Sequence, residues 1–207
     1  MSVEVEKHHR QSIRLQGYNY AQSGMYFITA CTEGRECLFG KVVQGKMIMD
    51  QVGQIVEGKW LKTPVLRPYV VLDEFVVMPN HFHAILLIVT AGRGTWPMEK
   101  PGRSRAPTTE RFGSPVSGSL PTIVRSFKSA AAKHINELRS TPGASLWQRG
   151  YYEHVIRDED ELQRIREYIL TNPLRWELDR ENPARHGEDE FDRWLASLSP
   201  KRGQVKK

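Results

Sequence analysis

Several stretches of the chain are rich in β-branched and aromatic residues and are bounded by turn-forming residues, which is typical of β-strands. This pattern predicts strands over residues 25–32, 36–43, 67–77, 81–89 and 146–157. A short Gly-containing link at 33–35 separates the first two runs and predicts a hairpin there. Pro79 and Asn80 interrupt the third and fourth runs, which indicates an antiparallel pair joined by a sharp bend.

Apolar residues recur at helical spacing elsewhere, which predicts helices over residues 50–61, 121–138, 158–172 and 188–198. Asp50 and Asp158 stand where N-caps are expected, and Glu161 completes a capping-box pattern with Asp158. Strands and helices do not alternate regularly along the chain, so the order favours an α+β protein over a βαβ repeat.

The 207 residues fit one domain. The hydrophobic content of 39% is enough for one core, because the polar segments of the chain contribute few of the apolar residues. These segments are an N-terminal arm (1–24), a long loop without periodicity (90–119) and a basic tail. No apolar run approaches the roughly 18 residues of a membrane helix. Cys31 and Cys37 are too few for a disulfide framework, which favours reduced thiols in a cytoplasmic protein.

A formal net charge of +6 permits a nucleic-acid partner without requiring one. The arm combines Arg10 and Arg14 with nearby tyrosines, so it is either a frayed end or a segment that follows a phosphate backbone. The loop at 90–119 is likewise either a basic flap over an anionic substrate or a solvated insertion.

Two histidines at alternate positions of a predicted strand, His81 and His83, point to the same face and are spaced to hold one metal ion. Two histidines at a sheet surface with no ligand role remain the alternative. Tyr168 and Asn172 lie four residues apart and share one helix face, which offers an oxygen nucleophile beside an amide ligand. Tyr151 and Tyr152 compete for the nucleophile role, and spacing alone does not join the two segments.

A family resemblance joins them. The sequence VMPNHFH at 77–83 resembles the His-hydrophobic-His signature of HUH single-strand endonucleases. The segments RLQGY at 14–18, YFIT at 26–29, WQRGYYEHVIR at 147–157, EYI at 167–169 and NPLRW at 172–176 resemble REP-associated tyrosine transposases, a branch of that group. The resemblance covers roughly residues 8–178, so residues 179–207 are expected to form a C-terminal extension outside the transposase domain (1–178).

The resemblance implies a ferredoxin-like antiparallel sheet of four or five strands with helices on one face. It also implies that His81, His83 and Asn172 bind Mg²⁺ or Mn²⁺ and that Tyr168 is the nucleophile. The implied activity is cleavage and rejoining of single-stranded DNA at hairpins of repetitive extragenic palindromes, through a 5′-phosphotyrosine. From charge we expect phosphate contacts at Arg10, Arg14, Arg125, Lys128 and Arg149.

Two other functions remain open at this point. The chain is either a non-catalytic hairpin-binding protein derived from a transposase, or a metal-dependent phosphoesterase acting on small nucleotides. We expect no membrane association, and the sequence leaves open whether the protein is a monomer or a homodimer.

Overall fold

The computed structural model describes residues 18–89 and 116–198, so most of the arm, most of the long loop and the end of the tail lie outside it. Its strands are β1 (Gly24–Cys31), β2 (Gly40–Val43), β3 (Lys46–Met49), β4 (Val70–Val77), β5 (His81–Ile88) and β6 (Tyr152–Ile156). Its helices are η1 (Glu33–Arg35), α1 (Gln51–Leu61), α2 (Thr63–Leu66), α3 (Leu120–Arg139), α4 (Glu159–Thr171), η2 (Asn172–Leu178) and α5 (Glu190–Leu198).

Four strands form the central sheet in the order β4-β5-β1-β6, and every neighbouring pair is antiparallel. Helix α1 connects β1 to β4, and α3 connects β5 to β6, which gives the β-α-β-β-α-β order of a ferredoxin-like domain. The predicted α+β class and its antiparallel sheet are therefore confirmed.

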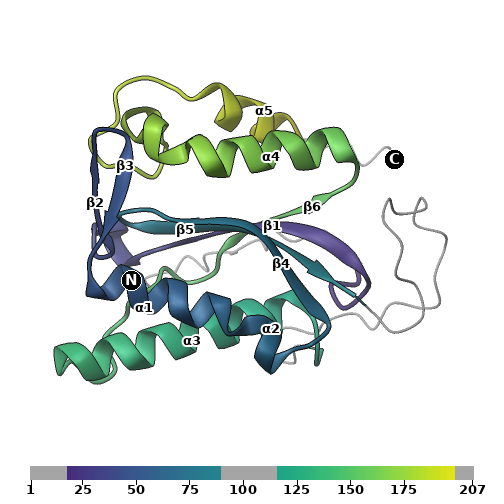
Figure 1. Ribbon diagram of the computed structural model, residues 1–207, viewed down its shortest axis with the longest axis horizontal. Helices are drawn as coiled ribbons and strands as arrows, with labels where there is room; N and C mark the ends of the chain where they lie inside the picture. Colours follow the sequence, from purple (N-terminus) through teal and green to yellow (C-terminus); the bar gives the residue numbers. More distant parts are fainter. Residues whose placement is uncertain (1–17, 90–115, 199–207) are drawn as a thin grey trace, which may run out of the picture.

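Helices cover both faces of this sheet, whereas the family resemblance led us to expect them on one. The connecting helices α1 and α3 pack on one face, and α4 and α5 lie over the other (Figure 1). Successive residues of β1 are apolar on both sides, with Tyr26 and Ile28 in one core cluster and Met25 and Phe27 in the other. A sheet with two apolar faces needs a layer on each, and the C-terminal helices provide the second layer.

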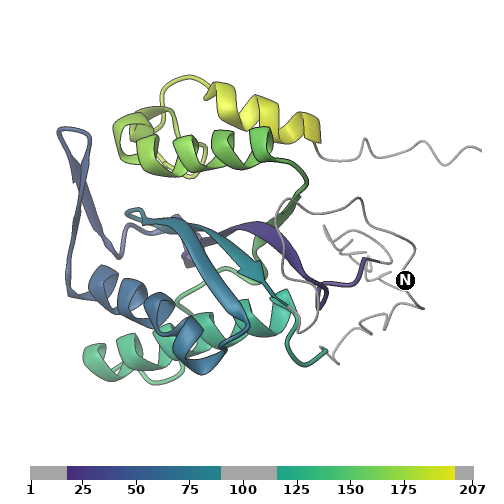
Figure 2. The ribbon, with the colours of Figure 1, turned by 45° about the vertical axis from the view of Figure 1, so that its right-hand side comes forward.

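The predicted hairpin between residues 25–32 and 36–43 is wrong. β1 pairs with β5 and β6, while β2 pairs with β3 across a turn at Gln44 and Gly45. Both turn residues have positive φ angles, 50° and 70°, as the common two-residue hairpin turn requires. Gln-Gly is a weaker sequence signal for this turn than Asn-Gly, which explains why β3 was not predicted. The hairpin rises beside the sheet to reach η2 (Figure 2).

The helix boundaries follow the predicted ones closely. Asp50 caps α1 by accepting hydrogen bonds from the backbone N–H groups of Val52 and Gly53, and Asp158 caps α4 by accepting one from Glu161. The strand predicted at 146–157 is shorter, because only Tyr152–Ile156 joins the sheet, and Trp147 forms an isolated bridge to Thr32. Within the described ranges, no helix combines the length and apolar character needed to cross a membrane.

Candidate active site

The imidazoles of His81 and His83 emerge at the start of β5 on the face covered by α4. Strand geometry places residues i and i+2 on one face, and the register sets His81 opposite Cys31 and His83 opposite Thr29 on the central strand β1. Both side chains are almost completely buried. Their ring centroids lie 4.4 Å apart, so the sheet presents two adjacent imidazoles to a single point.

Asn80 fixes which nitrogen of His81 is free. The Asn80 Nδ2 group donates to the backbone carbonyls of Arg35 (3.0 Å) and Glu181 (2.7 Å), which orients its Oδ1 toward His81 Nδ1 at 2.9 Å. Because an amide oxygen only accepts, Nδ1 of His81 carries the proton and Nε2 keeps its lone pair. Second-shell bonds of this kind orient histidine ligands in metal sites.

His83 is held in a similar way by a neighbouring strand. Its Nδ1 lies 2.8 Å from Thr29 Oγ1, and its Nε2 lies 3.2 Å from the hydroxyl of Tyr168 on α4. Burial lowers the pKa of both histidines, and for His83 the nearby His81 lowers it further. Both rings are therefore neutral at neutral pH, which is the form that binds metal ions.

Asn172 follows α4 directly and points its amide into the same space. Its Nδ2 donates to Asp179 Oδ2 at 2.8 Å, while its Oδ1 is buried without a hydrogen-bond partner among the described residues. His81 Nε2 is likewise buried and unpaired. Two buried acceptors without donors are costly unless a cation or another donor satisfies both. The donor set therefore fits a divalent metal ion.

Asp179 completes the cluster, although the sequence gave no reason to select it. It is the first residue after η2, and therefore lies just beyond the expected boundary at residue 178. Its carboxylate and the ring nitrogens of His81 and His83 all lie within 4.8 Å of one another. No spacing in the sequence links this carboxylate to a strand about a hundred residues earlier, so only the fold reveals it. The extension thus contributes to the site.

The Tyr168 hydroxyl sits between His83 and the Asp179 carboxylate, whose Oδ2 lies 3.4 Å away. Its ring stacks on Phe191 of α5 at 3.7 Å, and only 3% of the residue is exposed. Burial, followed by the charge of Asp179, raises the pKa of Tyr168 well above its ordinary value. The phenol is therefore un-ionised at neutral pH.

The competing tyrosines lie on opposite faces of the sheet, and Tyr152 shares the α4 face with Tyr168. Tyr151 packs against the core cluster on the α1 and α3 side of the sheet, and the Tyr152 ring lies 6.3 Å from that of Phe27. Of the three candidate nucleophiles, Tyr168 is the one whose hydroxyl meets a histidine of the cluster.

The residues predicted to contact phosphate are spread over the molecule. Arg10 and Arg14 lie outside the described residues, and Arg125 and Arg149 have exposed side chains. Lys128 is engaged internally, because its ammonium donates to the carbonyls of Gln148 (2.8 Å) and Gly150 (2.5 Å). Lys128 therefore helps to hold the loop at 148–150, which carries Arg149, against α3.

Comparison with known proteins finds a sequence relative and a structural neighbour. An uncharacterized protein of Haemophilus influenzae is 40% identical over 173 residues, which cover 84% of this chain and 93% of the relative. The solved structure of a REP-associated tyrosine transposase bound to a REP hairpin matches with a TM-score of 0.50 at 18% identity, covering 80% of this chain and 74% of the other. No family model matches the chain.

Proposed function

We propose that this protein, which belongs to the same family as the Haemophilus influenzae protein and has the fold of a REP-associated tyrosine transposase, is a metal-dependent tyrosine transposase. Its substrate would be single-stranded DNA at palindromic hairpins, which it would cleave and rejoin. The Tyr168 hydroxyl beside His83 is the observation that carries this proposal, because it brings a nucleophile to a cluster suited to a metal ion.

The residues that would hold the ion are His81, His83 and Asn172, and the Asp179 carboxylate would place a negative charge beside it. Oxygen and imidazole donors of this kind suit Mg²⁺ or Mn²⁺. When bound, such an ion polarises a phosphoryl oxygen and stabilises the charge that develops on a leaving oxygen.

Tyr168 would act as the nucleophile in a transesterification. Its Oη attacks the phosphorus, a phosphorus–oxygen bond to the tyrosine forms, and the bond to the 3′ oxygen breaks. The products are a 5′-phosphotyrosine and a free 3′-OH, and a second 3′-OH can reverse the step without ATP. The leaving 3′ oxygen takes up a proton as the phenol loses its own.

The raised pKa of Tyr168 means that its proton must be removed during the attack. His83 Nε2 lies 3.2 Å from the phenolic oxygen, but its lone pair would be occupied by the ion and could not also take the phenolic proton. Asp179 Oδ2 lies 3.4 Å from the hydroxyl and is the other acceptor within reach. We therefore assign Asp179 the role of proton acceptor for Tyr168.

Tyr168 is almost completely buried and its ring stacks on Phe191 of α5, so DNA can reach the hydroxyl only after a local movement. Binding of DNA and exposure of the nucleophile would therefore be coupled in this protein.

The decisive experiment incubates the protein with a labelled single-stranded DNA hairpin and Mn²⁺, followed by a denaturing gel. A labelled band at the protein's mass supports the covalent mechanism. Binding in a native gel without any adduct would favour the non-catalytic hairpin binder, and release of small nucleotides would favour the phosphoesterase. The panel of hairpins should include palindromic repeats with single-stranded feet of different sequence.

A further inference from the structure

Two arginines from distant parts of the chain converge on one carboxylate next to the candidate site. Arg35 Nε lies 3.2 Å from Oε2 of Glu181, and Arg180 Nε lies 3.0 Å from Oε1 of the same residue. The Glu181 side chain is 9% exposed, whereas those of Arg35 and Arg180 are 49% and 31% exposed. The two guanidinium groups thus form a fork that is accessible to solvent and binds both oxygens of one carboxylate.

This fork is tied to the histidine cluster. The backbone carbonyl of Arg35 and that of Glu181 both accept hydrogen bonds from Asn80, which also contacts His81. The Glu181 N–H donates to Asp179 Oδ1 at 2.7 Å. Arg35 and the segment that carries Arg180 are therefore both anchored to residues that orient or form the cluster.

The backbone at Arg35 adds an independent sign of function. Its φ angle is 58°, a left-handed conformation that costs free energy in a residue with a large side chain. The Asn80 hydrogen bond to its carbonyl helps to hold this conformation. Strained residues of this kind are concentrated at binding sites, where the surrounding structure fixes them.

We infer that Arg35 and Arg180 form a binding site for one backbone phosphate of the single DNA strand, with the Glu181 carboxylate filling it in the free protein. This inference rests on the proposed function, because it places the phosphate in the strand that enters the cluster. A phosphate presents two oxygens to paired guanidinium groups as a carboxylate does, and arginine is well suited to such recognition.

The charges around the fork are consistent with a DNA phosphate replacing the Glu181 carboxylate between the two arginines. Asp192 lies 3.7 Å from Arg180, so the free protein surrounds this guanidinium with carboxylates. The Arg180 guanidinium lies over the ring of Tyr152, 5.4 Å from its centroid. The pKa of Tyr168 is raised first by burial and then by Asp179, and the charge of Arg180 acts against both. Because Arg180 directly follows Asp179 in the chain, a phosphate held by Arg180 would lie near the candidate site.

The test measures binding of fluorescently labelled dT20 in EDTA, so that neither metal nor cleavage contributes. Arg35→Ala and Arg180→Ala should each weaken binding roughly tenfold, as expected for loss of a charge-assisted hydrogen bond. The slope of log affinity against log salt should fall by about 0.7, the value for one phosphate on a single strand. Glu181→Gln should strengthen binding, because the competing carboxylate loses its charge.

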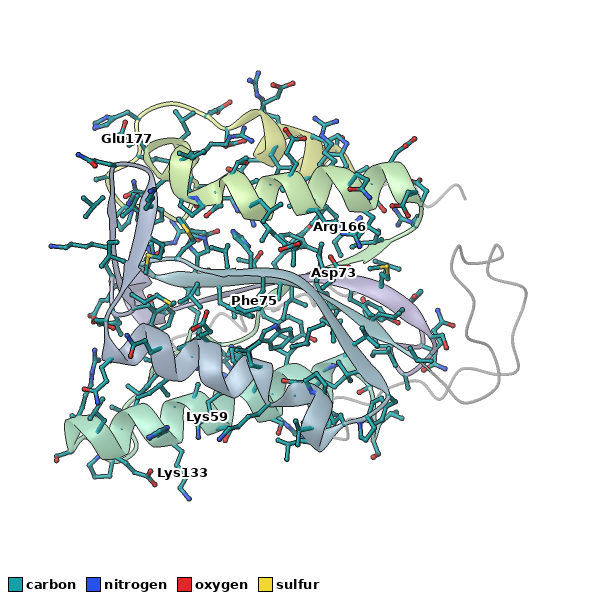
Figure 3. All side chains as sticks on the ribbon, viewed as in Figure 1. Lys59, Asp73, Phe75, Lys133, Arg166 and Glu177 are labelled. Atoms are coloured by element: carbon teal, nitrogen blue, oxygen red, sulfur yellow. The ribbon has the colours of Figure 1, made fainter. Side chains whose placement is uncertain are left out.

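Lys133→Ala is the matched control. Lys133 is exposed on the outer side of α3, on the opposite side of the sheet from α4 (Figure 3), and its removal changes the net charge equally. Arg35→Lys and Arg180→Lys keep the charge and lose the planar fork, so they should bind more weakly than wild type while folding normally. Because Arg35 and Arg180 share one phosphate, the double alanine variant should lose less than the sum of the two.

Unchanged dT20 binding in the alanine and lysine variants would overturn the inference, as would an equal loss with Lys133→Ala. The adduct assay reports separately on the proposed function. Absence of any adduct with the wild-type protein would contradict the transposase proposal while leaving the dT20 result intact. A wild-type adduct together with normal dT20 binding by both arginine variants would contradict the fork alone.

Discussion

The hydroxyl of Tyr168 lies 3.2 Å from Nε2 of His83, although one residue belongs to a helix and the other to the sheet beneath it. The contact exists because α4 packs across the face on which β5 presents its histidines. Close to this pair, His81 Nε2 and Asn172 Oδ1 are both buried and unpaired. The proposed nucleophile and the proposed metal ligands thus meet where two layers of the fold touch.

Replacing Tyr168 with Phe should abolish the covalent DNA adduct and leave hairpin binding largely intact. The ring still stacks on Phe191, so the free energy of unfolding should change by no more than about 1.5 kcal/mol, the range for one hydrogen bond. A denaturing gel and a urea titration measure the two effects. Tyr152→Phe is the control and should retain the adduct. An adduct that survives in Tyr168→Phe but disappears in Tyr152→Phe would move the nucleophile to β6.

Asp179→Asn should weaken Mn²⁺ binding, because an anionic oxygen within 4.8 Å of both histidine nitrogens becomes neutral. Titration calorimetry with Mn²⁺ measures this without reference to activity. His81→Ala should have the larger effect, since it removes a ligand rather than a charge. Equal Mn²⁺ affinity in wild type and Asp179→Asn would show that the ion does not bind beside this carboxylate.

Asn80→Ala should weaken Mn²⁺ affinity without removing any ligand. Its side chain holds the proton of His81 on Nδ1 and links two backbone carbonyls, so its loss frees the ring to rotate. Loss of second-shell partners typically costs about 10- to 100-fold in metal affinity. Asn80→Asp offers a comparison, because a carboxylate accepts from His81 but cannot donate to the carbonyls. If both variants bind Mn²⁺ as wild type does, Asn80 has no part in orienting the ligand.

Asp192→Asn should stabilise the protein in a pH-dependent way. Burial raises the pKa of Asp192 to about 6, and the Arg180 charge only partly opposes this. The folded state therefore binds a proton more tightly than the unfolded chain does, and stability falls as pH rises toward 6 and through it. The asparagine variant should gain about 1–2 kcal/mol at pH 8, after allowance for solvent screening, and little at pH 4. Urea denaturation at both pH values tests this, and an equal difference at pH 4 and pH 8 would contradict it.

Lys128→Met should lower the free energy of unfolding by about 1–3 kcal/mol, because two carbonyls lose their donor. Arg149→Ala, in the loop that Lys128 holds, should leave stability unchanged and weaken DNA binding. Thermal melts and the dT20 assay separate the two effects. Unchanged stability with weaker binding in Lys128→Met would instead support the direct phosphate contact predicted from the sequence.

An ion pair between Arg166 and Asp73 joins α4 to the edge strand β4 (Figure 3). The Asp73 carboxylate has its pKa lowered chiefly by the hydrogen bond from Arg166. This contact helps to set the position of α4, and hence of Tyr168, against the sheet. It involves residues distant in the sequence, so no local pattern predicted it.

Local sequence patterns predict most of the helices and strands and the residues on each of their faces. The strand pattern at 81–89 put His81 and His83 on one side, and the caps at Asp50 and Asp158 set where α1 and α4 begin. These features follow from φ/ψ preferences and hydrogen bonds between near neighbours, so they can be derived without the fold.

Which of these elements meet depends on the three-dimensional packing of the chain. The pairing of β1 with β5 and β6, the stacking of Phe191 on Tyr168 and the position of Asp179 beside the histidines all depend on packing between distant segments. The local pattern around Asp179 is that of an ordinary polar residue after a helical turn. Its role arises because burial removes water from its surroundings and leaves His81 and Asn172 as its neighbours.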